Sequence, residues 1–102
     1  MAKVRPPLEK AIAGQIIREL RGLGFHVSST QQTGPSRQTI GMPDLFVAHP
    51  VRKVYAWMEV KRPGKKPTEQ QAAWHEAVRD AGCPVLVVHS VIEAFDQLEA
   101  LR

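Results

Sequence analysis

Two apolar runs, residues 45–48 and 54–60, place the tightest constraint on how this sequence can fold. Both are rich in β-branched and aromatic residues, which favour strands. His49 follows the first run, and the four residues 50–53 form a loop before the second. We therefore predict a β-hairpin in which His49 faces Val54 across the loop.

The predicted hairpin brings two carboxylates together. Counting outward from the His49–Val54 pair puts Asp44 directly opposite Glu59, and cross-strand neighbours on one face lie about 5 Å apart. Lys61 follows Glu59 by two residues and projects from the same face. Hard cations such as Mg²⁺ accept carboxylate oxygens and leave water and phosphate to complete their shell. The pattern therefore predicts a divalent-metal site; the alternative is a surface hairpin with a Glu59–Lys61 ion pair.

A cation at this place has a use in phosphodiester hydrolysis. A bound metal ion lowers the pKa of its water and polarises the phosphodiester, and a nearby lysine orients the nucleophile or offsets charge on phosphate oxygens. The next residues are basic, with Arg62, Lys65 and Lys66 in one loop, and the chain has a formal net charge of +4. We expect this loop to bind phosphates; a merely solvated loop is the alternative.

The ordered set of these residues resembles a known nuclease signature. Gly-Met-Pro-Asp at residues 41–44, followed by Glu-Val-Lys at residues 59–61, is similar to the Pro-Asp…(Asp/Glu)-x-Lys motif of the PD-(D/E)xK nuclease superfamily. Within it, the chain resembles the virus-type replication–repair nucleases, the VRR-Nuc group. The resemblance extends from about Glu9 to Val88 and is strengthened by an early acidic residue, by Lys-x-Pro-Gly and by Thr…Gln-x-x-Trp, which here are Glu9, Lys61 to Gly64, Thr68, Gln71 and Trp74.

The resemblance implies a metal-dependent, structure-selective DNA endonuclease that acts in viral or bacterial replication and repair. DNA as the substrate, and branched DNA such as a four-way (Holliday) junction in particular, rest on the resemblance alone. The implied site comprises Mg²⁺ or Mn²⁺ held by Asp44, Glu59 and the Val60 carbonyl, Lys61 to orient or activate the attacking water, and Glu9 and Gln71 to assist, Glu9 directly or through water.

Two of these residues also have a structural explanation. Glu9 sits where a negative charge favours the positive end of a helix dipole. Thr68 and Gln71 form a capping-box signature, in which the glutamine bonds back to the helix start. For both residues we keep the structural and the catalytic role open.

Apolar periodicity and turn residues predict the remaining elements. The order is αβββαβα, an α/β fold with a small mixed sheet covered by helices on both faces, because both faces of the hairpin are largely apolar. The resemblance implies that this fold is restriction-endonuclease-like. Tyr55 and Trp57 are expected in the core, with base stacking as the alternative. The other elements are expected at residues 7–21 (helix), 25–30 (strand), 31–40 (a loop whose Arg37 could touch substrate), 68–81 (helix), 84–88 (a strand parallel to the hairpin's second strand) and 90–101 (a helix opened by a Ser90–Glu93 capping box, with Ile92 facing inward).

Length and composition set outer limits. A chain of 102 residues suits one domain, 1–102, around one core, and one cysteine suits a reducing compartment. No apolar run is long enough to span a bilayer, so we expect an intracellular, cytoplasmic protein. The histidines at positions 26, 49, 75 and 89 show no zinc-ligand spacing, and we expect them to serve packing or solvent contact.

Two other classes of function remain possible. One is a non-catalytic DNA-binding module, and the other is a protein-interaction domain whose carboxylates form surface ion pairs. Metal-dependent cleavage separates the nuclease from both. If a four-way junction is the substrate, two paired cuts favour a two-fold symmetric homodimer.

Overall fold

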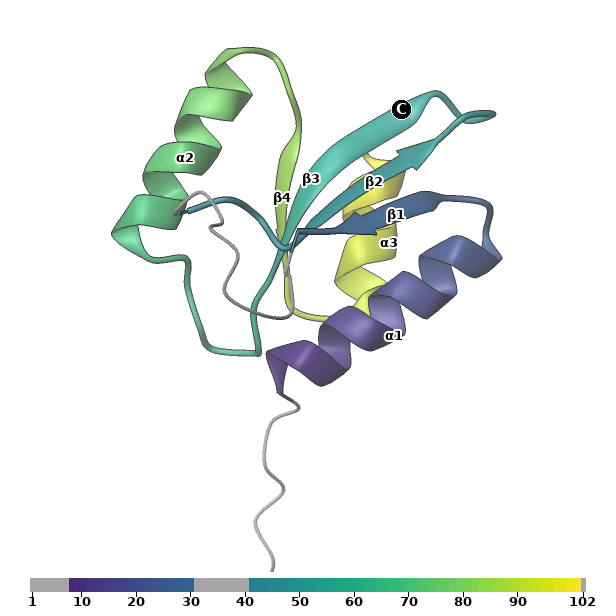
Figure 1. The fold of residues 1–102 in the computed structure, drawn as a ribbon, viewed down its shortest axis with the longest axis horizontal. Helices are drawn as coiled ribbons and strands as arrows, with labels where there is room; N and C mark the ends of the chain where they lie inside the picture. Colours follow the sequence, from purple (N-terminus) through teal and green to yellow (C-terminus); the bar gives the residue numbers. More distant parts are fainter. Residues whose placement is uncertain (1–7, 31–40, 102) are drawn as a thin grey trace, which may run out of the picture.

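The structure, a computed structural model, describes residues 8–30 and 41–101 and has the predicted order of elements (Figure 1). The fold is α/β, as predicted. Arg37 and the rest of the expected 31–40 loop lie outside the described residues. The elements are α1 (Glu9–Gly22), β1 (His26–Ser29), β2 (Leu45–His49), β3 (Val54–Val60), α2 (Glu69–Asp80), β4 (Val85–Val88) and α3 (Val91–Glu99).

The four strands form one mixed sheet in the order β1-β2-β3-β4. The first two pairings are antiparallel, and β3 pairs with β4 in parallel, as expected for strands joined through a helix. His49 pairs with Val54 and Leu45 with Met58, so the predicted register of the hairpin is confirmed.

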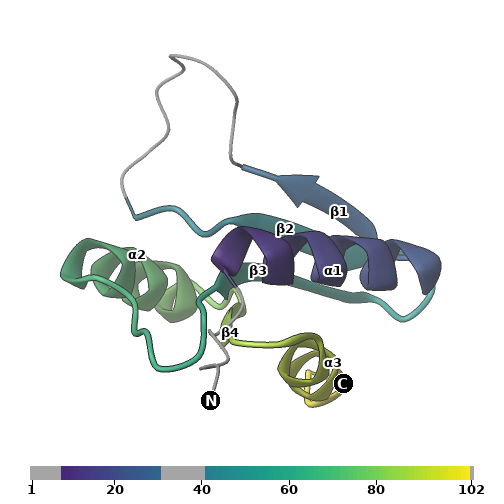
Figure 2. The same cartoon turned by 90° about the horizontal axis from the view of Figure 1, so that it is seen from below.

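One face of the sheet carries the hydrophobic core. Side chains alternate between faces along a strand, and Val47, Ala56 and Met58 on this face are completely buried. Helices α1 and α3 contact each other and pack against the sheet, and α1 contributes Ile16 and Leu20, both completely buried. Both views of the fold show α2 apart from these two helices (Figures 1 and 2).

Helix α2 lies on the other face, so helices are present on both sides of the sheet, as expected, but α2 covers its face only in part. Trp57 packs against Trp74 of α2 with ring centroids 5.5 Å apart, whereas Tyr55 is 48% exposed and is not the core residue that we expected. The cause is the position of β4, whose first residue pairs with Trp57. Because α2 leads into β4, it covers the sheet from Trp57 onward and leaves the hairpin end open.

The final helix differs from its prediction in two details. Ile92, expected to face inward, is 71% exposed, and Ala94 and Leu98 are the buried residues of α3. The Ser90 hydroxyl accepts from the Glu93 N–H, as predicted, but the Glu93 carboxylate accepts from the His89 N–H and not from Ser90. The start of α3 is therefore capped by Ser90, with Glu93 turned to the preceding residue. Among the helices of the described residues, none is long and apolar enough to cross a membrane.

Candidate active site

Asp44 is held at the start of β2 by its neighbours. Its Oδ2 accepts a hydrogen bond of 2.9 Å from the Val60 N–H, and its carbonyl accepts one of 2.8 Å from the Thr30 N–H. The Thr30 hydroxyl donates to the carbonyl of Pro43, which is itself buried. These bonds tie the acidic residue to strand β3, one residue from Glu59.

The chain needs a glycine at position 41, three residues before Asp44. Gly41 has a φ of 90°, and a Cβ at this position would lie only 2.6 Å from the Gln70 carbonyl oxygen. Only glycine adopts this conformation without strain and allows so close an approach. Gly41 thus brings the chain that precedes Asp44 against α2.

Glu59 is the most perturbed ionisable group of the site. The residue is 1% exposed, and burial raises its pKa to about 8, assisted by a hydrogen bond with Asp44 and by the charge of Asp44. The Lys61 charge lowers this pKa, and the Glu9 charge raises it slightly. Glu59 therefore keeps its proton at neutral pH, as expected for a buried carboxyl group beside a second acidic residue.

Three further side chains surround the Glu59 carboxylate. Lys61 Nζ lies 3.9 Å from Oε2, and the Lys61 side chain is 11% exposed. Gln71 Nε2 donates to the same oxygen at 3.4 Å. On the other side, His75 Nε2 lies 3.5 Å from Oε1. The carboxylate is therefore surrounded by the Lys61 ammonium group, the Gln71 amide and the His75 imidazole.

Gln71 makes both of the contacts that the sequence left as alternatives. Its Oε1 accepts from the Thr68 N–H at 2.9 Å, while the Thr68 hydroxyl accepts from the Gln71 N–H at 3.2 Å, which completes the predicted capping box. Its Nε2 is left to contact Glu59. The two ends of one amide serve the helix start and the site at once.

His75 is the site residue that the sequence analysis missed. It was grouped with the other histidines as packing or solvent contact, yet it is 1% exposed and lies against Glu59. Burial lowers the pKa of His75, with the positive charges of Arg79 and Lys61 acting in the same direction. Its position four residues after Gln71, on the same face of one helix, was the available signal.

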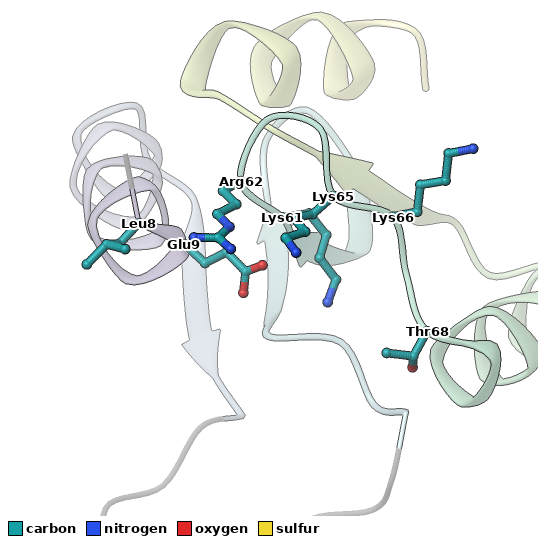
Figure 3. A pocket seen from close by; sticks show the side chains of 7 residues that line it. All are labelled: Leu8, Glu9, Lys61, Arg62, Lys65, Lys66 and Thr68. Carbon is teal, nitrogen blue, oxygen red and sulfur yellow. The ribbon is translucent and has the colours of Figure 1, made fainter. Parts of the chain in front are cut away.

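A basic pocket of about 500 Å³ opens beside the site between α1 and the loop after β3 (Figure 3). Glu9, Lys61, Arg62 and Lys65 point toward a shared space, whereas the Lys66 side chain is directed away from them. The residues that line this pocket are Leu8, Glu9, Lys61, Arg62, Lys65, Lys66 and Thr68.

The acidic pair fits a hard cation better than zinc. Within residues 8–30 and 41–101, no group of three or more His, Cys, Asp or Glu side chains is arranged to hold a metal ion. Asp44 and Glu59 are a donor set of the kind that Mg²⁺ uses, since Mg²⁺ takes one or two protein carboxylates and completes its shell with water and phosphate. The Val60 carbonyl belongs to the same strand segment, between Glu59 and Lys61.

The structure is a mixed α/β domain with an acidic pair and a lysine at adjoining strand ends, beside a basic pocket. Residues 15–92 match the VRR-NUC domain family. The chain belongs to this family, which confirms the resemblance seen in the sequence, although Glu9 precedes the matched segment.

A solved structure described as a VRR_NUC domain is similar throughout. It shares 30% sequence identity, with a TM-score of 0.73 over 92% of this chain and 97% of that chain. No curated protein matches this chain. The family and the fold are thus established together.

Proposed function

We propose that this chain is a metal-dependent endonuclease that hydrolyses phosphodiester bonds in DNA. The observation that carries the proposal is the buried Glu59 carboxylate, whose pKa is raised to about 8 beside Asp44 and Lys61. Burying a carboxylate without compensation is costly, and a divalent cation between the two acidic groups would remove that cost. A surface ion pair needs no such burial, so the interaction-domain alternative leaves the arrangement unexplained.

Each residue has a role that follows from its place. Asp44 and Glu59, with the Val60 carbonyl, would hold Mg²⁺ or Mn²⁺, which when bound activates water and polarises the scissile phosphate. Lys61, whose Nζ is 3.9 Å from Glu59 Oε2, would orient the attacking water and offset charge on the phosphate oxygens. Gln71 orients Glu59, and Glu9 faces the pocket as an assisting acid.

The basic pocket supports DNA as the substrate. Arg62 and Lys65 face the same space as Lys61 (Figure 3), so a phosphate bound there would lie next to the acidic pair. A structure-selective enzyme acting on branched DNA, with a four-way junction as one candidate, is the finer form of the proposal. Two-fold paired cuts on a junction would then require two copies of this chain.

A panel of labelled DNAs tests the function directly. Flap, splayed, nicked, duplex and four-way substrates are incubated with Mg²⁺, with Mn²⁺ and with EDTA. We expect cleavage of at least one branched substrate in either metal and none in EDTA. DNA binding without cleavage in any metal would favour the non-catalytic binding module. If the junction is cut, light scattering on the protein–junction complex decides whether two copies are present.

Replacing Asp44 should weaken the response of stability to metal. A ligand that binds only the folded state stabilises it by RT ln(1 + [L]/Kd), or about 1.4 kcal/mol at ten times Kd. We expect Mn²⁺ to raise the melting temperature of the wild type and to raise that of Asp44→Asn much less. Thermal scans against Mn²⁺ concentration measure this. Asp96→Asn, at an exposed position of α3, is the control, and an equal response in Asp44→Asn would remove Asp44 from the site.

Neutralising the loop should change the salt dependence of DNA binding. Each lost phosphate contact lowers the slope of log affinity against log salt by roughly one unit. Lys65→Gln should produce that loss, and Lys66→Gln a smaller one because its side chain points away from the pocket. Lys53→Asn is the matched control, since it removes one charge at the far end of β3 and asparagine tolerates its φ of 60°. An unchanged slope in Lys65→Gln would exclude its phosphate contact.

A further inference from the structure

Helix α2 meets the sheet through a polar contact. His75 is the one buried residue of α2, a helix that the structure describes throughout. Ala77 in this helix and Ala81 at its C-terminal end are exposed. A helix on a sheet normally buries an apolar stripe, but the most deeply buried side chain of this one is an imidazole that faces Glu59.

The two facing atoms of Glu59 and His75 have no hydrogen-bond partner among the described residues. Glu59 Oε1 and His75 Nε2 are both buried and form no hydrogen bond within the described part of the chain, and 3.5 Å separates them. A hydrogen bond needs a distance of about 2.7–3.2 Å, so a small closure of this gap would satisfy both atoms. Trp74, next to His75 in the chain, packs against Trp57 of β3 and keeps the helix in place.

The opposite oxygen of Glu59 is contacted from the preceding turn of the same helix. Gln71 Nε2 donates to Oε2, where Lys61 also lies. Residues four apart in a helix are neighbours on one face. Gln71 and His75 therefore offer one nitrogen to each oxygen of the carboxylate.

We propose that His75 is a positioning residue for the metal site: its Nε2–H donates to Glu59 Oε1 and fixes the orientation of the carboxylate that would hold the cation. The inference rests on the proposed function, because the cation is part of it. Outer hydrogen bonds of this kind orient metal-ligating groups, and their loss typically weakens metal affinity 10–100-fold.

The test measures Mn²⁺ binding to the DNA-free protein by calorimetry. His75→Phe keeps a ring but removes the donor, and we expect its Mn²⁺ affinity to fall 10–100-fold. His75→Gln returns an N–H donor at a similar reach and should recover affinity to within a few-fold of the wild type. His26→Phe, at an exposed position of β1, is the matched control and should bind as the wild type does.

The outcomes separate the inference from the proposed function. Wild-type protein that binds no Mn²⁺ would overturn the proposed function and the inference with it. Wild-type binding with equal affinity in His75→Phe, or an equal loss in His75→Phe and His75→Gln, would overturn the positioning role alone. If His75→Phe does not fold, the wild-type imidazole N–H resonance decides: we expect a protected signal that is lost in Glu59→Leu, which removes the acceptor, and an unprotected signal in the wild type would refute the contact.

Discussion

Lys61→Met should reduce DNA cleavage by about 10²–10⁴-fold while Mn²⁺ binding is retained. Methionine preserves much of the apolar stem, which matters because the Lys61 side chain is 11% exposed. The ammonium group is lost from its place 3.9 Å from Glu59 Oε2, so no charge remains there to orient water or to offset negative charge on the phosphate.

The assay for Lys61→Met needs a high pH. The Lys61 charge lowers the pKa of Glu59, so its removal makes Glu59 hold its proton more firmly and would weaken metal binding near neutrality. Single-turnover cleavage at about pH 9, with saturating Mn²⁺, separates the chemical role from this effect. Lys66→Met, whose side chain is directed away from the pocket, is the control. Near-normal turnover in Lys61→Met would contradict the assigned role.

Glu59→Gln should stabilise the metal-free protein at alkaline pH. Glu59 has a pKa of about 8 in the folded chain and an ordinary value of 4.5. The folded state thus holds the proton more tightly, and the stability this provides is complete below about pH 4.5 and is lost as the pH rises to about 8. Glutamine resembles the protonated form at every pH, so the variant keeps this stability.

Urea unfolding in EDTA at pH 5, 7 and 9 measures the effect. The free energies of unfolding should be similar at pH 5 and diverge by up to about 5 kcal/mol at pH 9, at roughly 1.4 kcal/mol for each unit of pKa. Glu76→Gln, at an exposed position of α2, should follow the wild type. Parallel stability curves for wild type and Glu59→Gln would show that Glu59 titrates normally. Mn²⁺ should narrow the gap at pH 9, because it stabilises the protein with the intact acidic pair more than the variant.

The hairpin and its register could be predicted because short-range rules determine them. Alternation sets the two faces, and a fixed loop length sets the pairing, so the opposition of Asp44 and Glu59 followed by counting. The capping box of Thr68 and Gln71 is equally local. The double role of Gln71 was not predictable, since it depends on where Glu59 lies relative to the start of α2.

The features that differ from the sequence-based predictions depend on packing between distant segments. The sheet face at Tyr55 is uncovered because the first residue of β4 pairs with Trp57. No local sequence pattern predicts that alignment. Ile92 fits a helical stripe as well as Ala94 does, and only the position of α3 decides between them. His75 escaped attention because we searched histidines for metal-ligand spacing, whereas its partner is a carboxylate on a strand.

The side-chain amide of Gln71 makes the geometry of the site depend on α2, the helix with the fewest buried residues. One side chain closes the first turn of α2 and touches Glu59, and α2 buries a single residue. Helix ends open locally with far less free energy than a central strand. When the first turn of α2 frays, the carboxylate loses its alignment while the sheet is still intact. Heating should therefore disorder the proposed site before it unfolds the sheet.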